Sequence, residues 1–227
     1  MRFAKAYFDI GLFTNQRDAQ QQFWSERAGL PFDHTQKLGG GVLQHRYAAG
    51  DAVLKLNDSR DPLPDCGPGR VRQILVADPR AAQPHDITDP DGNPLRLVPP
   101  GYQQITGLAA RINVSDRERS LAFYRDALGL TQLAPDQLSC GKAMLWLDES
   151  ETPATAPDQP LAALGIRYLT FQVFDCDQAF ADAIAAGATP AKHPVTLGAT
   201  ARIAFVLDPD GLWIELSQRA SVTGQAV

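Results

Sequence analysis

The feature that most constrains the fold is a repeat with a long period. Phe23-Trp24 followed by Gly29-Leu30 recurs as Phe123-Tyr124 followed by Gly129-Leu130, displaced by one hundred positions. The tetrapeptide Asp-Pro-Asp-Gly also occurs twice, at 89–92 and at 208–211. Self-similarity of this kind indicates duplicated modules, and it outweighs the propensity of any single segment.

The clearest copy of the module spans residues 165–216. An alternating segment is followed by a helical pattern that ends near Gly187, and two more alternating segments follow, joined by Asp-Pro-Asp-Gly. These patterns predict one βαβββ unit. Because strand side chains alternate between faces, Glu215 lies opposite Ile214 and Leu216 and points away from the core.

The same unit is repeated along the chain. Residues 7–57 and 107–149 each read as one copy, and residues 70–99 read as a truncated copy. Eleven positions separate Asp78 from Asp89, against thirty-three between Asp175 and Asp208, so a helix does not fit in the second unit. Pro99-Pro100-Gly101 is the natural boundary, which predicts two domains, residues 1–100 and 101–220. A polar, Pro-rich segment, 150–163, reads as a surface connection between units three and four.

Composition excludes several classes of function. A net charge of -5 and a pI near 5.3 argue against a surface for nucleic acid or anionic membrane. The three cysteines are widely separated, so neither a disulfide framework nor a Cys-x-x-Cys site is expected. No apolar run approaches eighteen residues and the first residues do not read as a signal peptide, so we expect a cytoplasmic protein.

With four such units, the motif F-Y-x-x-x-L-G-L at 123–130 and D-P-D-G-x-x-I-E-L at 208–216, the chain resembles the vicinal oxygen chelate superfamily. That group contains glyoxalase I, extradiol dioxygenases, fosfomycin-resistance enzymes and bleomycin-sequestering proteins. The resemblance implies that paired units curl into cups, each able to hold a divalent metal on four strand residues. It implies the fold and leaves the reaction open, because the fold supports lyases, isomerases, oxygenases and plain binders.

The metal positions that the resemblance implies hold few metal ligands in this chain. In the C-terminal pair of units they are Ala109, Trp146, Tyr168 and Glu215, of which only Glu215 could bind a metal. In the N-terminal pair they are Asp9, Lys55, Arg96 and either Val71 or Arg72. We therefore expect no metal at these positions and no cofactor, while a divalent metal at other positions is not excluded.

The charged residues in the N-terminal pair suggest an anion site. Lys55 and Arg96 would clamp a carboxylate or phosphate, Asp9 would transfer a proton, and His45 on an adjacent strand would face the same space. The alternative is that the three charged residues form a structural ion-pair cluster and that His45 is a satisfied strand histidine. Trp146, Tyr168 and Trp213 would line the C-terminal cup, either to bind a flat ligand or to fill it.

We therefore expect an α+β fold in which repeated βαβββ modules form two cupped mixed sheets. The leading functional hypothesis is binding of, or action on, a small anionic metabolite, by a metal-independent lyase or isomerase. One alternative is a non-catalytic protein that sequesters an aromatic or drug-like compound. Another is a metal-dependent glyoxalase or dioxygenase. The expected partner is a small molecule, without nucleic acid or membrane, and the chain is expected to be a monomer or a homodimer.

Overall fold

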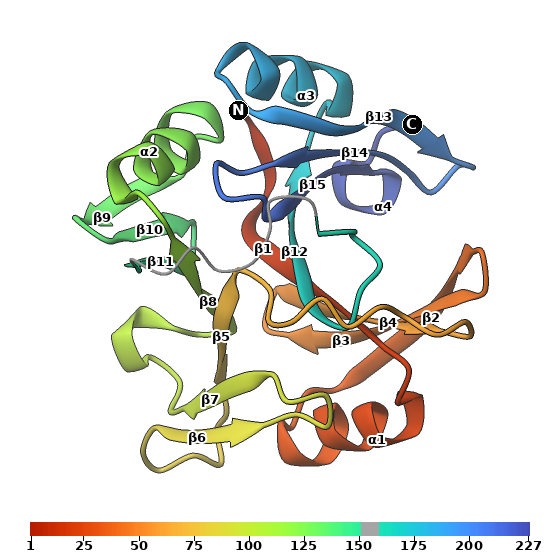
Figure 1. Cartoon of the computed structure of the whole chain (residues 1–227), viewed down its shortest axis with the longest axis vertical. Coiled ribbons are helices and arrows are strands. Elements are labelled where there is room, and N and C mark those ends of the chain that lie inside the picture. The colour runs from red at the N-terminus through yellow and green to blue at the C-terminus, as the bar shows by residue number, and fades with distance from the viewer. Residues whose placement is uncertain (151–158) are drawn as a thin grey trace.

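The computed structural model of the chain describes residues 1–150 and 159–227. Within these residues the strands form two curled mixed sheets, one of eight strands and one of seven (Figure 1). The first sheet has the order β13 (Thr189–Leu197), β14 (Ala201–Leu207), β15 (Trp213–Arg219), β12 (Gly165–Val173), β1 (Phe3–Thr14), β4 (Ala52–Ser59), β3 (Val42–Ala49), β2 (Phe32–Gly39). The second has the order β6 (His85–Thr88), β7 (Pro94–Val98), β5 (Val71–Ala77), β8 (Leu108–Val114), β11 (Ala143–Glu149), β10 (Gln137–Cys140), β9 (Thr131–Ala134).

Each unit has the expected strand pattern. The first and last strands of a unit run parallel beside each other: β1 with β4, β5 with β7, β8 with β11, and β12 with β15. Residues 70–99, all described, form three strands and no helix, which confirms the truncated second unit. The helical segments are α1 (Arg17–Gln22), η1 (Phe23–Arg27), η2 (Tyr102–Gln104), α2 (Arg117–Leu121), η3 (Ala122–Ala127), α3 (Cys176–Ala185) and α4 (Ala220–Thr223).

The sheets combine the units differently from the expected pairing. Strand β1 of the first unit pairs antiparallel with β12 of the fourth, and β5 of the second unit pairs antiparallel with β8 of the third. Each sheet therefore joins one unit from residues 1–100 with one from residues 101–220, and neither half of the chain holds a complete sheet. The connection predicted between the third and fourth units includes residues 151–158, which lie outside the described residues.

The core explains why both sheets carry apolar residues on one face. A single large cluster contains Leu12 and Leu54 of the first sheet, Ile74 of the second, and Trp24 and Phe180 from helical segments. Two smaller clusters lie on the opposite faces, one around Tyr168 and Phe205 and one around Leu75 and Trp146. The large core thus lies on the helix-covered side, and each sheet keeps a second face for other contacts.

The two repeated motifs contact each other across units. The buried hydroxyl of Tyr124 donates a hydrogen bond to Asp208 Oδ2 at 2.8 Å. In the first half, Trp24 Nε1 donates to Gln20, whose own amide donates to Asp89 Oδ2 at 3.0 Å. Helical segments therefore link units one to two and three to four, while the sheets link one to four and two to three.

None of the helices within residues 1–150 and 159–227 has the length and apolar character required to span a membrane.

Candidate functional site

The centre of the site is a buried ion pair between two units. We call the face of the eight-stranded sheet that carries Asp9, Lys55, Thr170 and Glu215 the first cup. Lys55 Nζ donates to Glu215 Oε2 at 2.7 Å and to Thr170 Oγ1 at 2.7 Å, and Thr170 Oγ1 donates to the same Glu215 oxygen at 2.6 Å. Burial lowers the pKa of Lys55, against the opposing effect of the Glu215 carboxylate. These three groups, from β4, β12 and β15, are therefore all hydrogen-bonded to one another.

Asp9 lies in the same cup and ties three strands together. Its carboxylate accepts from the Val53 amide at 3.0 Å and from Gln172 Nε2 at 3.1 Å, and Lys5 Nζ lies 3.5 Å from it. Asp9 and Glu215 were expected in different cups. The antiparallel pairing of β1 with β12 brings both carboxylates into one cup, since it joins the first unit to the fourth.

His45 does not face this cup, which corrects the sequence expectation. In the pairing of β3 with β4, Arg46 lies opposite Lys55, whereas His45 lies opposite the core residue Leu56. The His45 ring is instead hydrogen-bonded to Thr35 Oγ1 at 2.8 Å, and burial lowers its pKa. His45 therefore lies on the opposite face of β3 from Arg46 and the first cup.

The first cup carries more positive than negative charge. Arg46 is only 5% exposed, and within residues 1–150 and 159–227 its side chain donates one hydrogen bond, at 2.7 Å, to the neutral amide oxygen of Gln44. Arg219 donates to the amide oxygen of Gln36 at 3.3 Å, and burial together with the nearby Arg46 charge lowers its pKa. Among the described residues, neither guanidinium forms an ion pair with a carboxylate. Four cationic side chains, Lys5, Arg46, Lys55 and Arg219, thus stand against two carboxylates, Asp9 and Glu215.

The cup also holds buried polar atoms without partners. Both Gln172 Oε1 and Arg219 Nε are buried, and neither has a hydrogen-bond partner in the described part of the chain. In the pairing of β12 with β15, Gln172 lies beside Ser217. Ser217 comes two positions before Arg219 on β15. Buried polar groups are normally satisfied, so this cup holds one acceptor and one donor whose hydrogen-bonding capacity is unused.

Aromatic rings form one end of the first cup. Tyr168 packs against Phe13 and Phe205, and Phe205 packs edge-on against Trp213 at 5.8 Å between ring centroids. Gly11 makes this possible, because a Cβ there would lie 2.0 Å from the Tyr168 ring. Leu63 and Leu161 pack against the same rings from the connecting loops. Trp146, expected beside Tyr168 and Trp213, lies in the other sheet.

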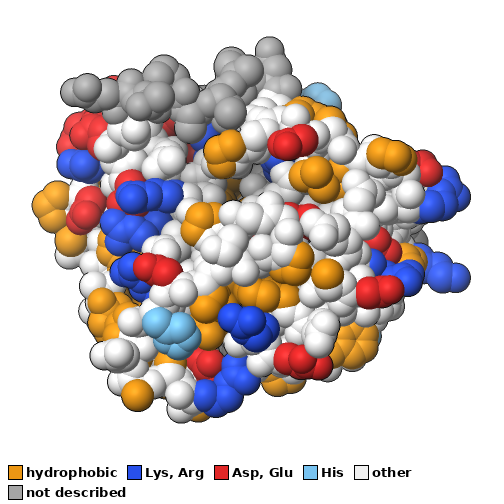
Figure 2. All heavy atoms as spheres, turned by 60° about the horizontal axis from the view of Figure 1, so that its bottom comes forward, with side chains coloured by type: hydrophobic (Ala, Val, Ile, Leu, Met, Phe, Trp, Pro, Cys, Tyr) orange, Lys and Arg blue, Asp and Glu red, His pale blue; other side chains and the backbone are white. Residues whose placement is uncertain are grey.

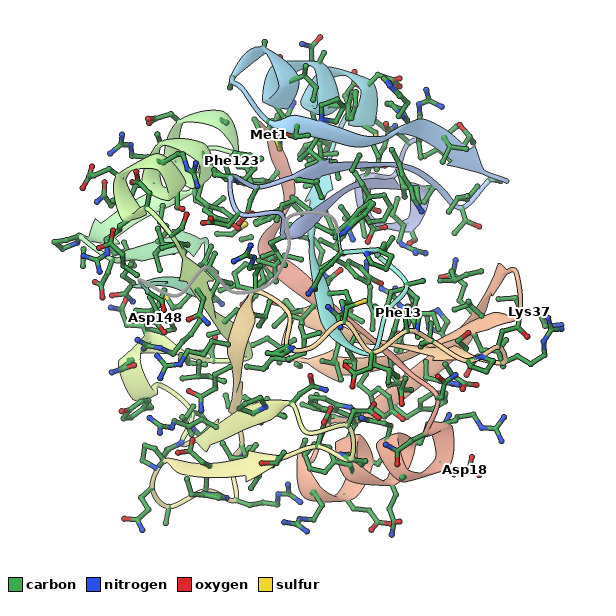
Figure 3. The ribbon with its side chains drawn as sticks, in the orientation of Figure 1. Met1, Phe13, Asp18, Lys37, Phe123 and Asp148 are labelled. Carbon is green, nitrogen blue, oxygen red and sulfur yellow. The ribbon has the colours of Figure 1, made fainter. Side chains whose placement is uncertain are left out.

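Arg96 and Trp146 belong to the face of the seven-stranded sheet that we call the second cup. Arg96 makes a bidentate pair with Asp86 at 2.8 and 2.7 Å, and so does not join Lys55 in a clamp. Ala109 is buried here beside Leu75 and Trp146. A register shift between Val71 and Gln73 turns Val71 into the large core and directs Arg72 to Asp148 at 3.2 Å. The two cups are faces of different sheets. Figure 3 labels Phe13 from the first sheet and Asp148 from the second, and they lie apart in that view.

The residues of the first cup do not fit a divalent metal. No three His, Cys, Asp or Glu side chains among the described residues converge on one point. The four positions implied by the units that share this sheet offer two carboxylates, and one of these is bonded to the Lys55 ammonium. Three or four convergent ligands are normally required, and a lysine cation beside them repels a metal ion.

The sequence of this chain matches a known protein family. The model of the "Glyoxalase/Bleomycin resistance protein/Dioxygenase superfamily" matches residues 104–216. The chain belongs to this superfamily. No curated protein sequence matches the chain.

Solved structures of the superfamily share the fold over the whole chain. Glyoxalase I from Zea mays is 16% identical with a TM-score of 0.73, covering 96% of this chain and 92% of that chain. A mutant of that enzyme gives a TM-score of 0.75 at 16% identity and covers 100% and 96%. A putative dioxygenase from Bacillus subtilis is 12% identical with a TM-score of 0.66, covering 96% and 86%. At these identities the likeness shows the fold alone.

The sequence reasoning missed four residues of the first cup: Arg46, Thr170, Gln172 and Arg219. Arg219 could have been found, because it continues the alternation of Trp213, Glu215 and Ser217 along one face. Arg46 required the turn between β3 and β4 to be read correctly. Thr170 and Gln172 could also have been found, because they continue the alternation of Tyr168 along β12. The sequence carries no local signal for the pairing of β1 with β12, which brings Asp9 and Lys55 into the same cup.

Proposed function

We propose that the chain binds a small anionic metabolite in the first cup and acts on it as a metal-independent lyase or isomerase. One observation carries this proposal: Arg46 and Arg219 are neighbouring cations in a largely buried cup, and neither has a carboxylate partner among the described residues. A buried charge without a partner is costly, and a bound anion would supply the missing counter-charge. Guanidinium groups also match the planar geometry of a carboxylate.

The free polar atoms refine the class of ligand. Arg219 Nε is a donor, which suits a carboxylate oxygen, whereas Gln172 Oε1 is an acceptor, which requires a hydroxyl or amine on the ligand. A small hydroxy or amino carboxylate satisfies both. The sequence predicted that Lys55 and Arg96 bind an anion. In this proposal Arg46 and Arg219 take the place of Arg96.

The chemistry would be proton transfer next to the bound carboxylate. Lys55, with its pKa lowered by burial, is closer to the range in which an amine exchanges protons at neutral pH. Thr170 connects its amine to Glu215, so a proton removed from a ligand carbon by one group can be returned to another carbon by the other. Asp9 stays a candidate for the same role, while the geometry does not favour His45.

A binder of an aromatic compound is the second candidate. The ring cluster of Phe13, Tyr168, Phe205 and Trp213 offers a flat apolar surface in the same cup. Displacement of Leu63 and Leu161 would expose it. Such a protein would hold its ligand stoichiometrically and release it unchanged.

A thermal-shift panel separates these functions. Hydroxy, amino and oxo carboxylates, phosphate and flat aromatic compounds would be added to the purified chain, and each stabilising compound would be followed by NMR for product. A carboxylate that stabilises and is converted, with conversion reduced in Thr170→Val, supports the enzyme. Capture of an aromatic compound without product supports the binder. Equimolar metal in the purified protein, required for conversion, would contradict the proposal.

A further inference from the structure

The second cup contains an arginine-lined cavity that the proposed function does not use. Its volume is about 560 Å³, within the range typical of small-molecule sites. The charged side chains along its wall are Arg72, Arg96, Arg111 and Asp86. Three cations and one carboxylate therefore face the same space in a chain whose net charge is -5. Figure 2 shows Lys and Arg side chains gathered at the left, the side on which Figure 1 places β5, β8 and β11.

The arginines are held in place by carboxylates next to the cavity. Asp148 receives a bidentate contact from Arg111 and a hydrogen bond from Arg72 at 3.2 Å. Asp86 receives the bidentate contact from Arg96 and a bond from Gln73 at 3.0 Å. Each guanidinium has five N–H donors, so these contacts fix its orientation and leave other donors free. Preorganised donors reduce the entropy lost when a ligand binds.

Part of the cavity wall is apolar and can contact the body of a ligand, although Gln73 and Gln103 also line it. Leu75 and Tyr102 line it, and Val98, Ala109 and Trp146 lie in the apolar cluster behind them. Tyr102 is held there by a turn in which Gln103 and Gln104 both adopt positive φ, 46° and 67°. Such a conformation is unfavourable for residues other than glycine, and it is typical of segments that shape a binding site.

We infer that the second cup is an independent site for a small organic anion, a carboxylate or phosphate attached to an apolar or aromatic body. The anionic group contacts Arg96 and Arg111, with Arg72 at the more exposed side, and the body lies against Tyr102 and Leu75. This site shares no residue with the first cup.

The test is an NMR titration of the full chain through the Nε–Hε resonances of its arginines. Phosphate, acetate and benzoate are added separately, and Arg96→Gln and Arg111→Gln assign the two resonances. We expect saturable shifts of both, with benzoate binding more tightly than acetate because its ring contacts Tyr102. Shifts caused by phosphate would identify a phosphate as the anionic group, and shifts caused by benzoate would identify a carboxylate. Either result supports the site.

Variants decide where the anion binds. Arg96→Gln should weaken binding about tenfold or more, as expected when a charged hydrogen-bonded contact is lost. Arg202→Gln is the matched control, because Arg202 makes a bidentate pair with Asp177 of similar exposure on the helix-covered side. Arg46→Gln in the first cup should leave the shifts unchanged. The inference is overturned by the absence of saturable shifts at Arg96 and Arg111, by equal weakening in Arg202→Gln, or by loss of binding in Arg46→Gln alone.

Discussion

Single residues decide how the first cup differs from a metal site. Lys55 lies between the carboxylates of two units, and its ammonium group is bonded to Glu215 and Thr170. Both partners of the ion pair are almost fully buried, with side-chain exposures of 3% and 10%. The Lys55 ammonium therefore gives the Glu215 carboxylate the positive partner that would otherwise be a ligand or an ion.

Replacing Lys55 tests the strength of this arrangement. Lys55→Met should destabilise the chain by about 3–5 kcal/mol, because it leaves a buried carboxylate without its cation. Lys55→Met combined with Glu215→Gln should recover most of that loss. Urea unfolding provides the measurement, with Arg125→Gln at the exposed Arg125–Asp126 pair as a control expected to cost less than about 1 kcal/mol. A Lys55→Met cost no larger than the control would show that the pair is not structurally important.

Asp208 predicts a pH dependence of stability. Burial raises its pKa to about 6, above the ordinary value of 3.8, although Tyr124 and two backbone amides donate to it. Between these values the folded chain keeps a proton that the unfolded chain has lost, so this contribution is present below pH 3.8 and lost as the pH rises through 6. The free energy of unfolding of Asp208→Asn, relative to wild type, should therefore increase from pH 4 to pH 6.5. A constant difference over this range would contradict the assignment.

Alternation along strands predicted the positions of Asp9, Lys55 and Glu215, but it failed for His45. The hairpin between β3 and β4 turns on two residues, Gly50 and Asp51, with Gly50 at a φ of 64°. This two-residue turn places Arg46 opposite Lys55. A turn longer or shorter by one residue would exchange the two faces of β3 and place His45 there instead. A register error of this size leaves the fold correct and changes the chemistry of the site.

At the scale of elements, the short helix α4 lies at the end of the first cup that carries Arg219. It follows Arg219 directly, has no buried residues, and contacts both β15 and β1. Strand β12 lies between those two strands, so α4 crosses the sheet at the end where Arg219 lies. We expect an anion that enters at this end to displace α4.

Weakening α4 should therefore speed ligand entry. Ser221→Gly with Val222→Gly lowers helix propensity by up to about 1 kcal/mol at each position without changing charge or length. We expect an association rate several-fold higher than wild type in stopped-flow measurements with the best anion, and little loss of thermal stability. The control places the same two glycines at Ala185 and Ala186, exposed residues at the end of α3. Equal association rates in wild type and the α4 variant would show that this helix does not limit entry.

At the scale of the whole molecule, the sequence predicted the βαβββ units, the truncated second unit and the two sheets. It did not predict which units share a sheet, because strand alternation and turn motifs are properties of one unit at a time. The pairing of β1 with β12 joins residues more than 150 positions apart. The contacts of Tyr124 with Asp208 and of Gln20 with Asp89 instead follow the order of the chain.

The two halves should therefore depend on each other. Expressed separately, residues 1–100 lose the antiparallel partners of β1 and β5, and residues 101–227 lose the antiparallel partners of β12 and β8. Each half would expose long strand edges and apolar surface. We expect neither to form a folded monomer, and we expect mixing to restore a one-to-one complex, as measured by circular dichroism and size-exclusion chromatography. Two stable, independently folded halves would contradict the observed sheets.

The central claim is that Arg46 and Arg219 provide the counter-charge for a small anion in the first cup. Calorimetric titration of wild type, Arg46→Gln and Arg202→Gln with the anion that best stabilises the chain tests it most directly. We predict that Arg46→Gln weakens binding about tenfold or more, whereas Arg202→Gln binds like wild type. The same affinity in all three proteins would contradict the claim.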